Sequence, residues 1–155
     1  VGDIVCIKRD MREAGKVPSR AIKIHSEIYT QHPEINSIII AHPPYIMSYA
    51  VTDEPLDSRS IPESYILMRD IPKVEYSEFY RDPVESAQLF SESTPIVMVN
   101  NDCIAVTGDD LLNAFDRLEV AEYSAKALVF SKHLGEMVPI DGKQISEIKD
   151  AFNLK

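Results

Sequence analysis

The chain of 155 residues carries 25 acidic and 16 basic side chains, which gives a net charge of −9 with its four histidines neutral. This length suits one domain with a real core, and shares of 45% hydrophobic and 26% charged residues are typical of a globular protein. An acidic chain without a basic cluster argues against nucleic-acid binding. No apolar run approaches the roughly 20 residues that cross a bilayer, so we expect no membrane span.

The chain has two cysteines, Cys6 and Cys103, which are far apart in the sequence. Two cysteines that are far apart favour a reduced, cytoplasmic protein over a disulfide scaffold. The first residues also lack the pattern of a signal peptide. The sequence begins at Val1, and residues 4–7 (IVCI) already predict a core strand. Because a protein seldom begins in the middle of its fold, we expect that an upstream part is absent.

The first half of the chain predicts a strand, a helix, a second strand and a second helix. A charged turn over residues 11–19 follows the first strand, and Ser19 is a candidate cap for a helix that ends before Pro33. Residues 37–41 (SIIIA) form a continuous apolar run, which predicts a strand buried on both faces. A helix can begin at Pro43-Pro44, because proline is tolerated in the first turn. The apolar stripe of the first helix contains Ala21, Ile24, His25 and Ile28.

The middle of the chain is less regular. Residues 52–64 are polar and predict the longest loop, residues 65–80 are ambiguous, and residues 82–91 predict a short helix that begins at Pro83. Two strands, over residues 95–99 and 103–106, flank a turn formed by Asn100, Asn101 and Asp102.

The last part of the chain predicts two helices. Gly108 and Asp109 precede the first of these, which continues to Gly135, and Asp141 is the expected cap of the second. Their apolar stripes contain Leu111, Phe115, Leu118, Ala121, Ala125, Leu128 and Val129 in the first helix, and Ile145, Ile148 and Phe152 in the second. We therefore expect one α/β domain with antiparallel pairing in at least its second half.

Few residues have a pattern that indicates chemistry. The four histidines, His25, His32, His42 and His133, include no pair at a spacing typical of a metal site. His42 directly follows a predicted strand, where ligands collect in α/β domains; the alternative is a hydrogen-bonded histidine with a structural role. The occurrence of Asp102 is explained by its position in a predicted turn, where aspartate is common. Helix capping explains Asp109 and Asp110, burial explains Cys103, and Glu119 and Glu122 are expected to face solvent.

Three segments together resemble the class II aldolase/adducin family. Residues 16–50 (KVPSRAIKIHSEIYTQHPEINSIIIAHPPYIMSYA) are similar to its Pro-Ser-Ser-Glu motif and its His-x-His-Pro-Pro strand end. Residues 96–128 (IVMVNNDCIAVTGDDLLNAFDRLEVAEYSAKAL) are similar to its Asn-His-Gly hairpin and the helix after it, and residues 134–152 fit its C-terminal helix. The resemblance implies an α/β fold with α+β character, in which helices flank a central mixed, largely antiparallel sheet.

The family's chemistry uses a divalent metal, usually zinc, which three histidines hold and which polarises a ketose phosphate, while the glutamate moves a proton. By this resemblance the glutamate position is Ala21, the three histidine positions are Ile40, His42 and Asp102, and the glycine of Asn-His-Gly is Cys103. Ala21 cannot move a proton and Ile40 cannot bind a metal, so no catalytic residue is carried over. His42 and Asp102 remain as candidate metal ligands.

The resemblance leaves two hypotheses of function. In the first, the chain keeps the fold without aldolase activity, as adducin does, and has a structural or binding role with no cofactor. In the second, it is a divergent aldehyde-lyase whose His42 and Asp102 bind zinc or another divalent metal, with a third ligand near Glu63 or from a neighbouring subunit. A proton could then come from Tyr49, Tyr65 or Tyr76.

The resemblance also bears on partners. Family domains have a helix and a Gly-Asn-x-Ser phosphate-binding loop ahead of the first strand found here, and we expect residues 1–155 to be a single domain that lacks this segment. A sugar-phosphate ligand is the partner that the family implies, although the missing loop and the charge of −9 both disfavour tight binding of an anion. Family members assemble as symmetric tetramers, so we expect a homo-oligomer.

Overall fold

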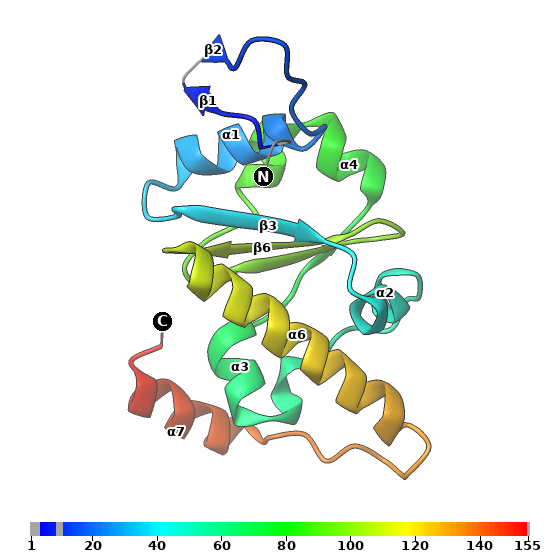
Figure 1. Cartoon of the computed structure of the whole chain (residues 1–155). Coiled ribbons are helices and arrows are strands. Elements are labelled where there is room, and N and C mark those ends of the chain that lie inside the picture. Colours follow the sequence, from blue (N-terminus) through cyan, green and yellow to red (C-terminus); the bar gives the residue numbers. More distant parts are fainter. Residues whose placement is uncertain (1–3, 9–10, 155) are drawn as a thin grey trace.

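The computed structural model describes residues 4–8 and 11–154, and it places helices on both faces of a central mixed sheet (Figure 1). No helix within these ranges is long and apolar enough to cross a membrane. The elements in chain order are β1 (Ile7–Lys8), β2 (Met11–Arg12), α1 (Ile22–Gln31), β3 (Ser37–Ala41), α2 (Pro44–Ala50), the 3₁₀ turn η1 (Ser58–Ser60), α3 (Pro62–Met68), β4 (Lys73–Val74), α4 (Tyr76–Arg81), α5 (Pro83–Ala87), β5 (Ile96–Val99), β6 (Ile104–Gly108), α6 (Leu111–Ser131) and α7 (Gly142–Phe152).

The sheet has the strand order β3-β6-β5-β4. Strand β6 is antiparallel to both neighbours, whereas β4 is parallel to β5, so the sheet is mixed and largely antiparallel as expected. The two central strands are buried along their whole length. The expectation that residues 37–41 are buried on both faces is wrong, because β3 lies at the edge of the sheet and is only partly buried from Ile38 onward.

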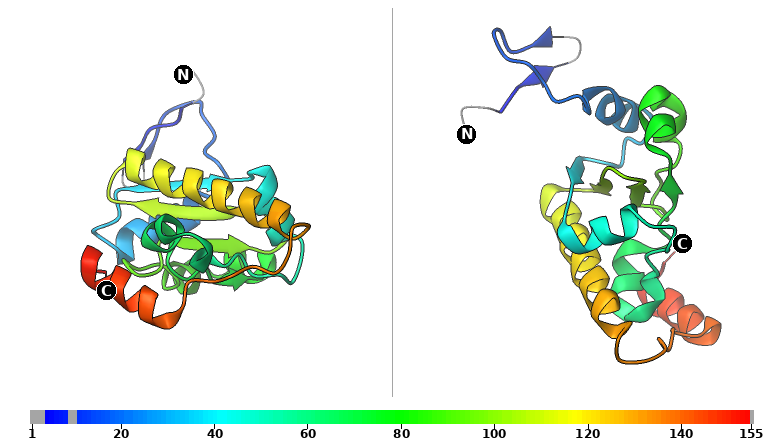
Figure 2. Two further views of the ribbon diagram at one scale, coloured as in Figure 1. Left: turned by 90° about the horizontal axis from the view of Figure 1, so that it is seen from below. Right: turned by 90° about the vertical axis from the view of Figure 1, so that its right-hand side faces the viewer.

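The alternation of side chains in the central strands divides the core into two apolar clusters. Ile96 and Met98 of β5 face the layer that contains α2, α3 and α6, whereas Val97 and Val99 face the layer that contains α1, α4 and α5. The right-hand view in Figure 2 shows these helical layers on opposite sides of the strands. The predicted inward residues Ala21, which precedes α1, and Ile24 and Ile28 within it are all buried in the second cluster.

The prediction of a core strand at residues 4–7 is wrong. Strand β1 pairs with β2 and not with the central sheet, and the resulting small hairpin projects from the body of the molecule (Figure 2). Ile4 is 69% exposed, because the β1–β2 hairpin does not pack into either apolar cluster. Part of the predicted charged turn is β2 itself.

Helix boundaries follow local signals with some corrections. Asp110 and Asp141 cap α6 and α7 through their side chains, and Asp141 forms a capping box with Gln144. The cap position of α1 is Ala21 and not Ser19, whose hydroxyl accepts a hydrogen bond from the Ala21 N–H at 3.3 Å. Helix α5 ends at Ala87 rather than at residue 91, and the predicted loop 52–64 contains η1 and the start of α3. The ambiguous residues 65–80 complete α3 and form β4 and most of α4.

The apolar stripes of the last two helices are only partly covered. Ala121, Ala125 and Leu128 are buried as expected, but Leu111 and Phe115 at the start of α6 are 68% and 51% exposed. In α7, Ile145 is buried whereas Phe152 is exposed. Periodicity predicts which residues share a helix face, but it does not reveal how much of that face another element covers.

Candidate functional site

The register of the sheet brings together two candidate residues that lie 60 positions apart. Ala41 at the end of β3 is paired with Ile104 at the start of β6. His42 directly follows β3 and Asp102 precedes β6, so the antiparallel pairing places both at the same edge of the sheet. The Nε2 atom of His42 lies 4.0 Å from the Oδ1 atom of Asp102. The His42 side chain is 63% exposed and that of Asp102 is 18% exposed.

The turn that carries Asp102 is held on both sides. Asn101 has a φ of 56°, in the left-handed region that asparagine tolerates better than most residues. Its N–H donates to the carbonyl of Ala50 at the end of α2 at 2.9 Å, and the Asn100 side-chain amide donates to Glu75 at 2.8 Å. The predicted turn is therefore confirmed, and it holds Asp102 in a defined place.

Tyr80 of α4 completes the cluster, although no sequence pattern indicated this residue. Its hydroxyl donates to the Oδ2 atom of Asp102 at 2.8 Å and lies 3.7 Å from the sulfur of Cys103. Burial, and then the hydrogen bond to a carboxylate, raise the pKa of Tyr80. Spacing gave no signal for this contact, because 22 residues separate the two partners.

Cys103 behaves as the buried small residue that was expected. It is fully buried, and burial raises the pKa of its thiol to about 12, with the neighbouring Asp102 adding to the shift. A neutral thiol is a poor nucleophile and a poor metal ligand. The cluster around Asp102 therefore consists of one carboxylate, one imidazole and two groups that keep their protons.

The positions that correspond to the family's remaining catalytic residues are apolar and packed. Ala21 is 8% exposed within the cluster beneath α1, and Ile40 packs against the same cluster. Neither side chain has a donor atom for a metal or a proton to transfer. Ala21 is therefore part of the core of this chain, and the partly buried Ile40 packs against that core.

The donor set does not fit the three-histidine metal site that the family implies. Within the described residues, no group of three or more histidine, cysteine, aspartate or glutamate side chains could hold a metal ion. One carboxylate oxygen of Asp102 already accepts from Tyr80, which leaves the other oxygen and the imidazole of His42. Catalytic zinc needs three protein ligands, and two donor atoms fall short of that number.

The other residues proposed for a rebuilt site lie in different places. Glu63 is in the first turn of α3, which packs against α6 in the opposite helical layer. Tyr49 and Tyr65 are buried on α2 and α3. Tyr76 is the exception, because its ring centroid lies 5.1 Å from that of Tyr80. The structure therefore brings one of the three candidate tyrosines near Asp102, and it does not bring Glu63 there.

Glu122 was expected to face solvent, and this expectation is wrong. Its two carboxylate oxygens accept hydrogen bonds from the N–H groups of Tyr45 at 3.1 Å and Ile46 at 3.0 Å. These groups are in the first turn of α2, three and four residues after His42, and the negative charge also suits the helix dipole there. Glu122 thus fixes the helix that follows His42, while Glu119 on the same helix is exposed.

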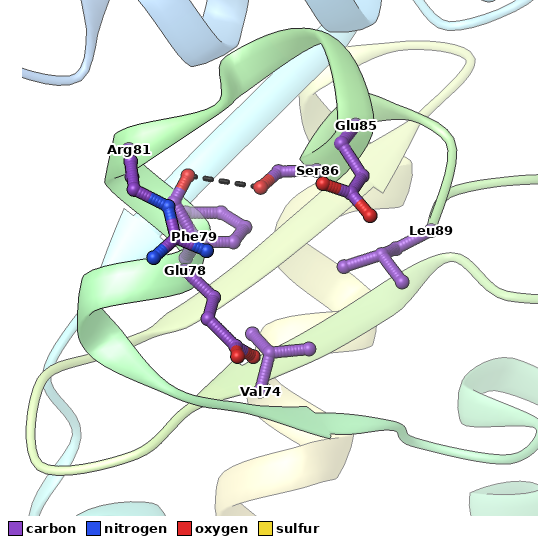
Figure 3. Close-up of a pocket in the computed structure, with 7 residues that line it drawn as sticks. All are labelled: Val74, Glu78, Phe79, Arg81, Glu85, Ser86 and Leu89. Carbon is purple, nitrogen blue, oxygen red and sulfur yellow. Dashed lines mark hydrogen bonds between the residues drawn. The ribbon is translucent and has the colours of Figure 1, made fainter.

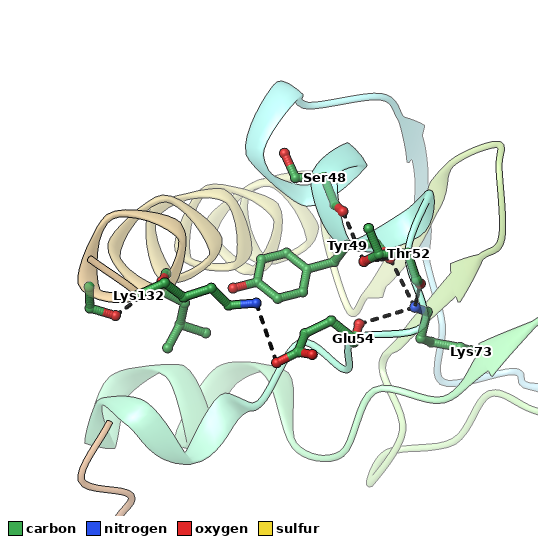
Figure 4. Close-up of polar contacts among 8 residues, drawn as sticks. Ser48, Tyr49, Thr52, Glu54, Lys73 and Lys132 are labelled. Atoms are coloured by element: carbon green, nitrogen blue, oxygen red, sulfur yellow. Dashed lines mark hydrogen bonds and ion pairs between the residues drawn. The ribbon is translucent and has the colours of Figure 1, made fainter. Parts of the chain in front are cut away.

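Lys73 supports the site from the other end of α2. Its ammonium group donates to the carbonyls of Tyr49 at 2.9 Å, Thr52 at 2.5 Å and Glu54 at 3.1 Å, as Figure 4 shows. Nearby, Lys132 is paired with the Glu54 carboxylate at 3.3 Å. Strand β4 is therefore tied to the end of α2 and to the segment that follows it.

The remaining histidines have structural surroundings. His32 contacts the carbonyl of Ala87 at 2.9 Å. The Nε2 atom of His25 is buried and has no hydrogen-bond partner among the described residues, and burial lowers the pKa of this histidine. His133 is exposed after α6. None of the three contributes to the cluster at His42 and Asp102.

A hollow of about 190 Å³ beside β4 offers no second catalytic cluster (Figure 3). Glu78, Arg81 and Glu85 are among its lining residues, and Ser86 uses its hydroxyl to donate to the carbonyl of Phe79 at 3.0 Å. Charges of both signs are mixed around this hollow, and it contains no histidine or cysteine.

Comparison with known proteins gives a consistent result. The class II aldolase and adducin N-terminal domain family matches residues 1–129. L-fuculose phosphate aldolase of Methanococcus vannielii is 28% identical over 118 residues, which cover 73% of this chain and 64% of that protein. The 3-oxo-tetronate 4-phosphate decarboxylase of Haemophilus influenzae is 29% identical over 119 residues, which cover 72% of this chain and 56% of that protein.

Solved structures have the same fold. An L-fuculose 1-phosphate aldolase superposes with a TM-score of 0.75 at 25% identity, over 91% of this chain and 66% of that one. YgbL of Escherichia coli superposes with a TM-score of 0.77 at 18% identity, over 90% and 69% of the two chains. The chain thus spans less than two thirds of the length of the curated relatives that it matches.

Proposed function

The chain belongs to the class II aldolase and adducin family, and from this premise we propose that it is a member without aldolase activity that has a binding or structural role. The observation that carries the proposal is Ala21. It stands where the resemblance places the glutamate that moves the proton, and it is buried in the apolar core. A proton-transfer step needs a titratable group within hydrogen-bond reach of the substrate, and alanine has none.

The metal positions support the same proposal. Ile40 replaces a histidine and packs against the core, and Asp102 replaces another and accepts a hydrogen bond from Tyr80. A Lewis-acid step depends on a firmly held ion. With two donor side chains in place of three histidines, this chain has lost the means to hold zinc tightly and needs no cofactor for its role.

One observation favours a second function. His42 and Asp102 approach within 4.0 Å, and an ion between them would need a third ligand from a neighbouring subunit. The chain would then be a divergent aldehyde-lyase that acts on a sugar phosphate, in line with relatives named fuculose phosphate aldolase. A carboxylate and an imidazole can both ligate zinc.

Zinc content and retro-aldol activity separate the two functions. We expect the purified chain, after incubation with zinc and desalting, to retain well below one ion per chain and to release no aldehyde from fuculose 1-phosphate or ribulose 5-phosphate. Zinc is measured by mass spectrometry and the aldehyde by a coupled reductase assay. The double variant Ile40→His/Asp102→His restores the three-histidine set, and we expect it to raise zinc retention.

The alternative makes the opposite prediction. Stoichiometric zinc in the unchanged chain, lost in His42→Ala and accompanied by turnover, would contradict the proposed function and support a rebuilt metal site. Zinc that is retained equally by His42→Ala and the unchanged chain would instead show binding at a place other than this cluster.

We also propose that the chain assembles with copies of itself in the cytoplasm. Leu111, Leu112 and Phe115 at the start of α6 are each more than half exposed and lie within one and a half turns of the helix, which is an apolar surface suited to a partner. The two cysteines are free, which suits a reducing compartment.

A further inference from the structure

A hollow of about 290 Å³ lies between the end of α2, the segment that follows α2, and the end of α6. This volume is close to the lower limit for small-molecule sites, so the hollow suits a ligand with few heavy atoms. A neighbouring hollow of about 330 Å³ shares some of its walls. The lining residues that decide the chemistry of the first hollow are Tyr49, Glu54, Asp57, Leu128, Lys132 and Met137.

Tyr49 brings an unpaired hydroxyl group to this hollow. The residue is only 3% exposed, yet its hydroxyl has no hydrogen-bond partner among the described residues. Figure 4 shows its ring pointing from α2 toward Lys132, whose ammonium group lies 5.7 Å from the ring centroid. Burial, and then the charge of Glu54, raise the pKa of Tyr49, so the hydroxyl keeps its proton. A buried hydroxyl without a partner costs free energy, and a ligand that bonds to it removes this cost.

The charged groups around the hollow leave one carboxylate without a cation. Lys132 is already paired with Glu54 at 3.3 Å. Asp57 is half-buried and forms no ion pair within the part of the chain that the structure describes. Its Oδ1 atom accepts from the Arg59 N–H at 2.8 Å, which leaves the other oxygen for a ligand. Two carboxylates against one ammonium group give the hollow a net negative charge, which favours a ligand with a positive charge.

Apolar side chains form another part of the wall. Leu128, near the end of α6, is 8% exposed, and Met137 lines the same hollow. Ser131 also lines it, but its hydroxyl donates to the carbonyl of Leu128 at 3.0 Å. Its proton is therefore already used within the chain, unlike that of Tyr49. The hollow thus combines two polar groups that lack partners with an apolar surface, which suits a ligand with a charged end and a short apolar chain.

We propose that this hollow binds a small organic cation that consists of a primary ammonium group on a short apolar chain. The ammonium group donates to the Tyr49 hydroxyl and to the Asp57 carboxylate, and the apolar chain lies against Leu128 and Met137. An ammonium group has three donors and no acceptor, so it matches a carboxylate and the lone pairs of a hydroxyl. The inference rests on the binding role proposed above and names a ligand class for it. The site uses neither residue of the candidate metal cluster.

Pentylamine is a suitable probe, because at neutral pH it combines a single positive charge with an unbranched apolar chain. We expect an NMR titration of the isotope-labelled chain to give saturable shifts in the amide signals of the residues that line the hollow. Two related compounds separate the contributions to binding. 1-Pentanol keeps the apolar chain without the charge, and methylamine keeps the charge without the chain. Each should bind at least tenfold more weakly than pentylamine, because it loses one of the two contacts.

Two substitutions test the polar contacts. Asp57→Asn removes the charge, keeps the oxygen that accepts from Arg59, and should weaken pentylamine binding at least tenfold. Asp150→Asn makes the same change of net charge at an exposed position of α7 and should leave the affinity unchanged. Tyr49→Phe removes only the hydroxyl. It should weaken binding about fivefold without lowering the melting temperature, because this hydroxyl has no partner in the described chain to lose.

Several results would overturn the proposal. These are the absence of saturable shifts around the hollow, equal affinity for pentylamine and 1-pentanol, equal affinity in Asp57→Asn and its control, and unchanged affinity in a folded Tyr49→Phe. Melting curves verify that each variant is folded. Failure of the proposed function is a separate outcome, because zinc-dependent turnover would reveal it whether or not the hollow binds an amine.

Discussion

His25 shows how one side chain can couple the stability of this fold to pH. It is a half-buried residue of α1, its Nε2 atom has no hydrogen-bond partner within residues 4–8 and 11–154, and burial lowers its pKa. In the unfolded chain the same imidazole titrates at about pH 6.5. Below that pH the unfolded state binds more protons than the folded state, so acidification lowers the free energy of unfolding.

The prediction concerns the variant His25→Phe. We expect it to raise the free energy of unfolding by about 1 kcal/mol at neutral pH, because it removes an unsatisfied buried polar atom, and to flatten the loss of stability below about pH 6.5. Urea unfolding at a series of pH values measures both effects. His133→Phe changes an exposed histidine and should keep the slope of the unchanged chain; a slope that survives in His25→Phe would assign the pH dependence to other groups.

Helix α2 depends on a residue from another element, and this contact can be tested directly. Glu122 of α6 accepts the Tyr45 and Ile46 N–H groups, which no residue within α2 itself caps. We expect Glu122→Ala to lower the free energy of unfolding by about 2 kcal/mol, as for the loss of a charged helix cap. Glu119→Ala, one turn earlier on the exposed face, should change it by no more than about 0.5 kcal/mol. Equal effects in urea unfolding would show that the contact contributes nothing.

Sequence patterns predicted correctly those features whose conformation depends on residues close together in the chain. Asn100 to Asp102 form the expected turn because their residue types suit it, and Asp141 caps α7 as expected. The contacts that define the site were not predictable in this way. Tyr80 reaches Asp102 across 22 residues, and Glu122 reaches Tyr45 across 77.

The prediction that β3 is buried on both faces was wrong for a related reason. The apolar run of β3 has the composition of a central strand, and nothing within it indicates that one side has no further strand. The family resemblance added what local patterns could not, because it paired His42 with Asp102 before any geometry was known. Their separation of 4.0 Å agrees with that pairing, whereas the metal between them stays a prediction.

At the scale of the whole molecule, charge and exposed apolar surface oppose each other. Two copies that each carry a charge of −9 repel one another, and Asp109 and Asp110 lie directly beside the apolar surface at the start of α6. Removing apolar side chains such as Leu112 from water favours association, and this gain grows with the area buried. Salt screens the repulsion without weakening the apolar contact, so assembly should increase with ionic strength.

The last prediction follows from that balance. We expect light scattering after size exclusion to give a mass above that of one chain, with a larger share of the assembled form at higher salt. Phe115→Glu places a further negative charge in the surface and should shift the protein to the monomer. Phe152→Glu makes the same change at another exposed phenylalanine, on α7, and should leave the assembly intact. A monomer at every salt concentration would contradict self-assembly, and dissociation by Phe152→Glu alone would move the interface from α6 to α7.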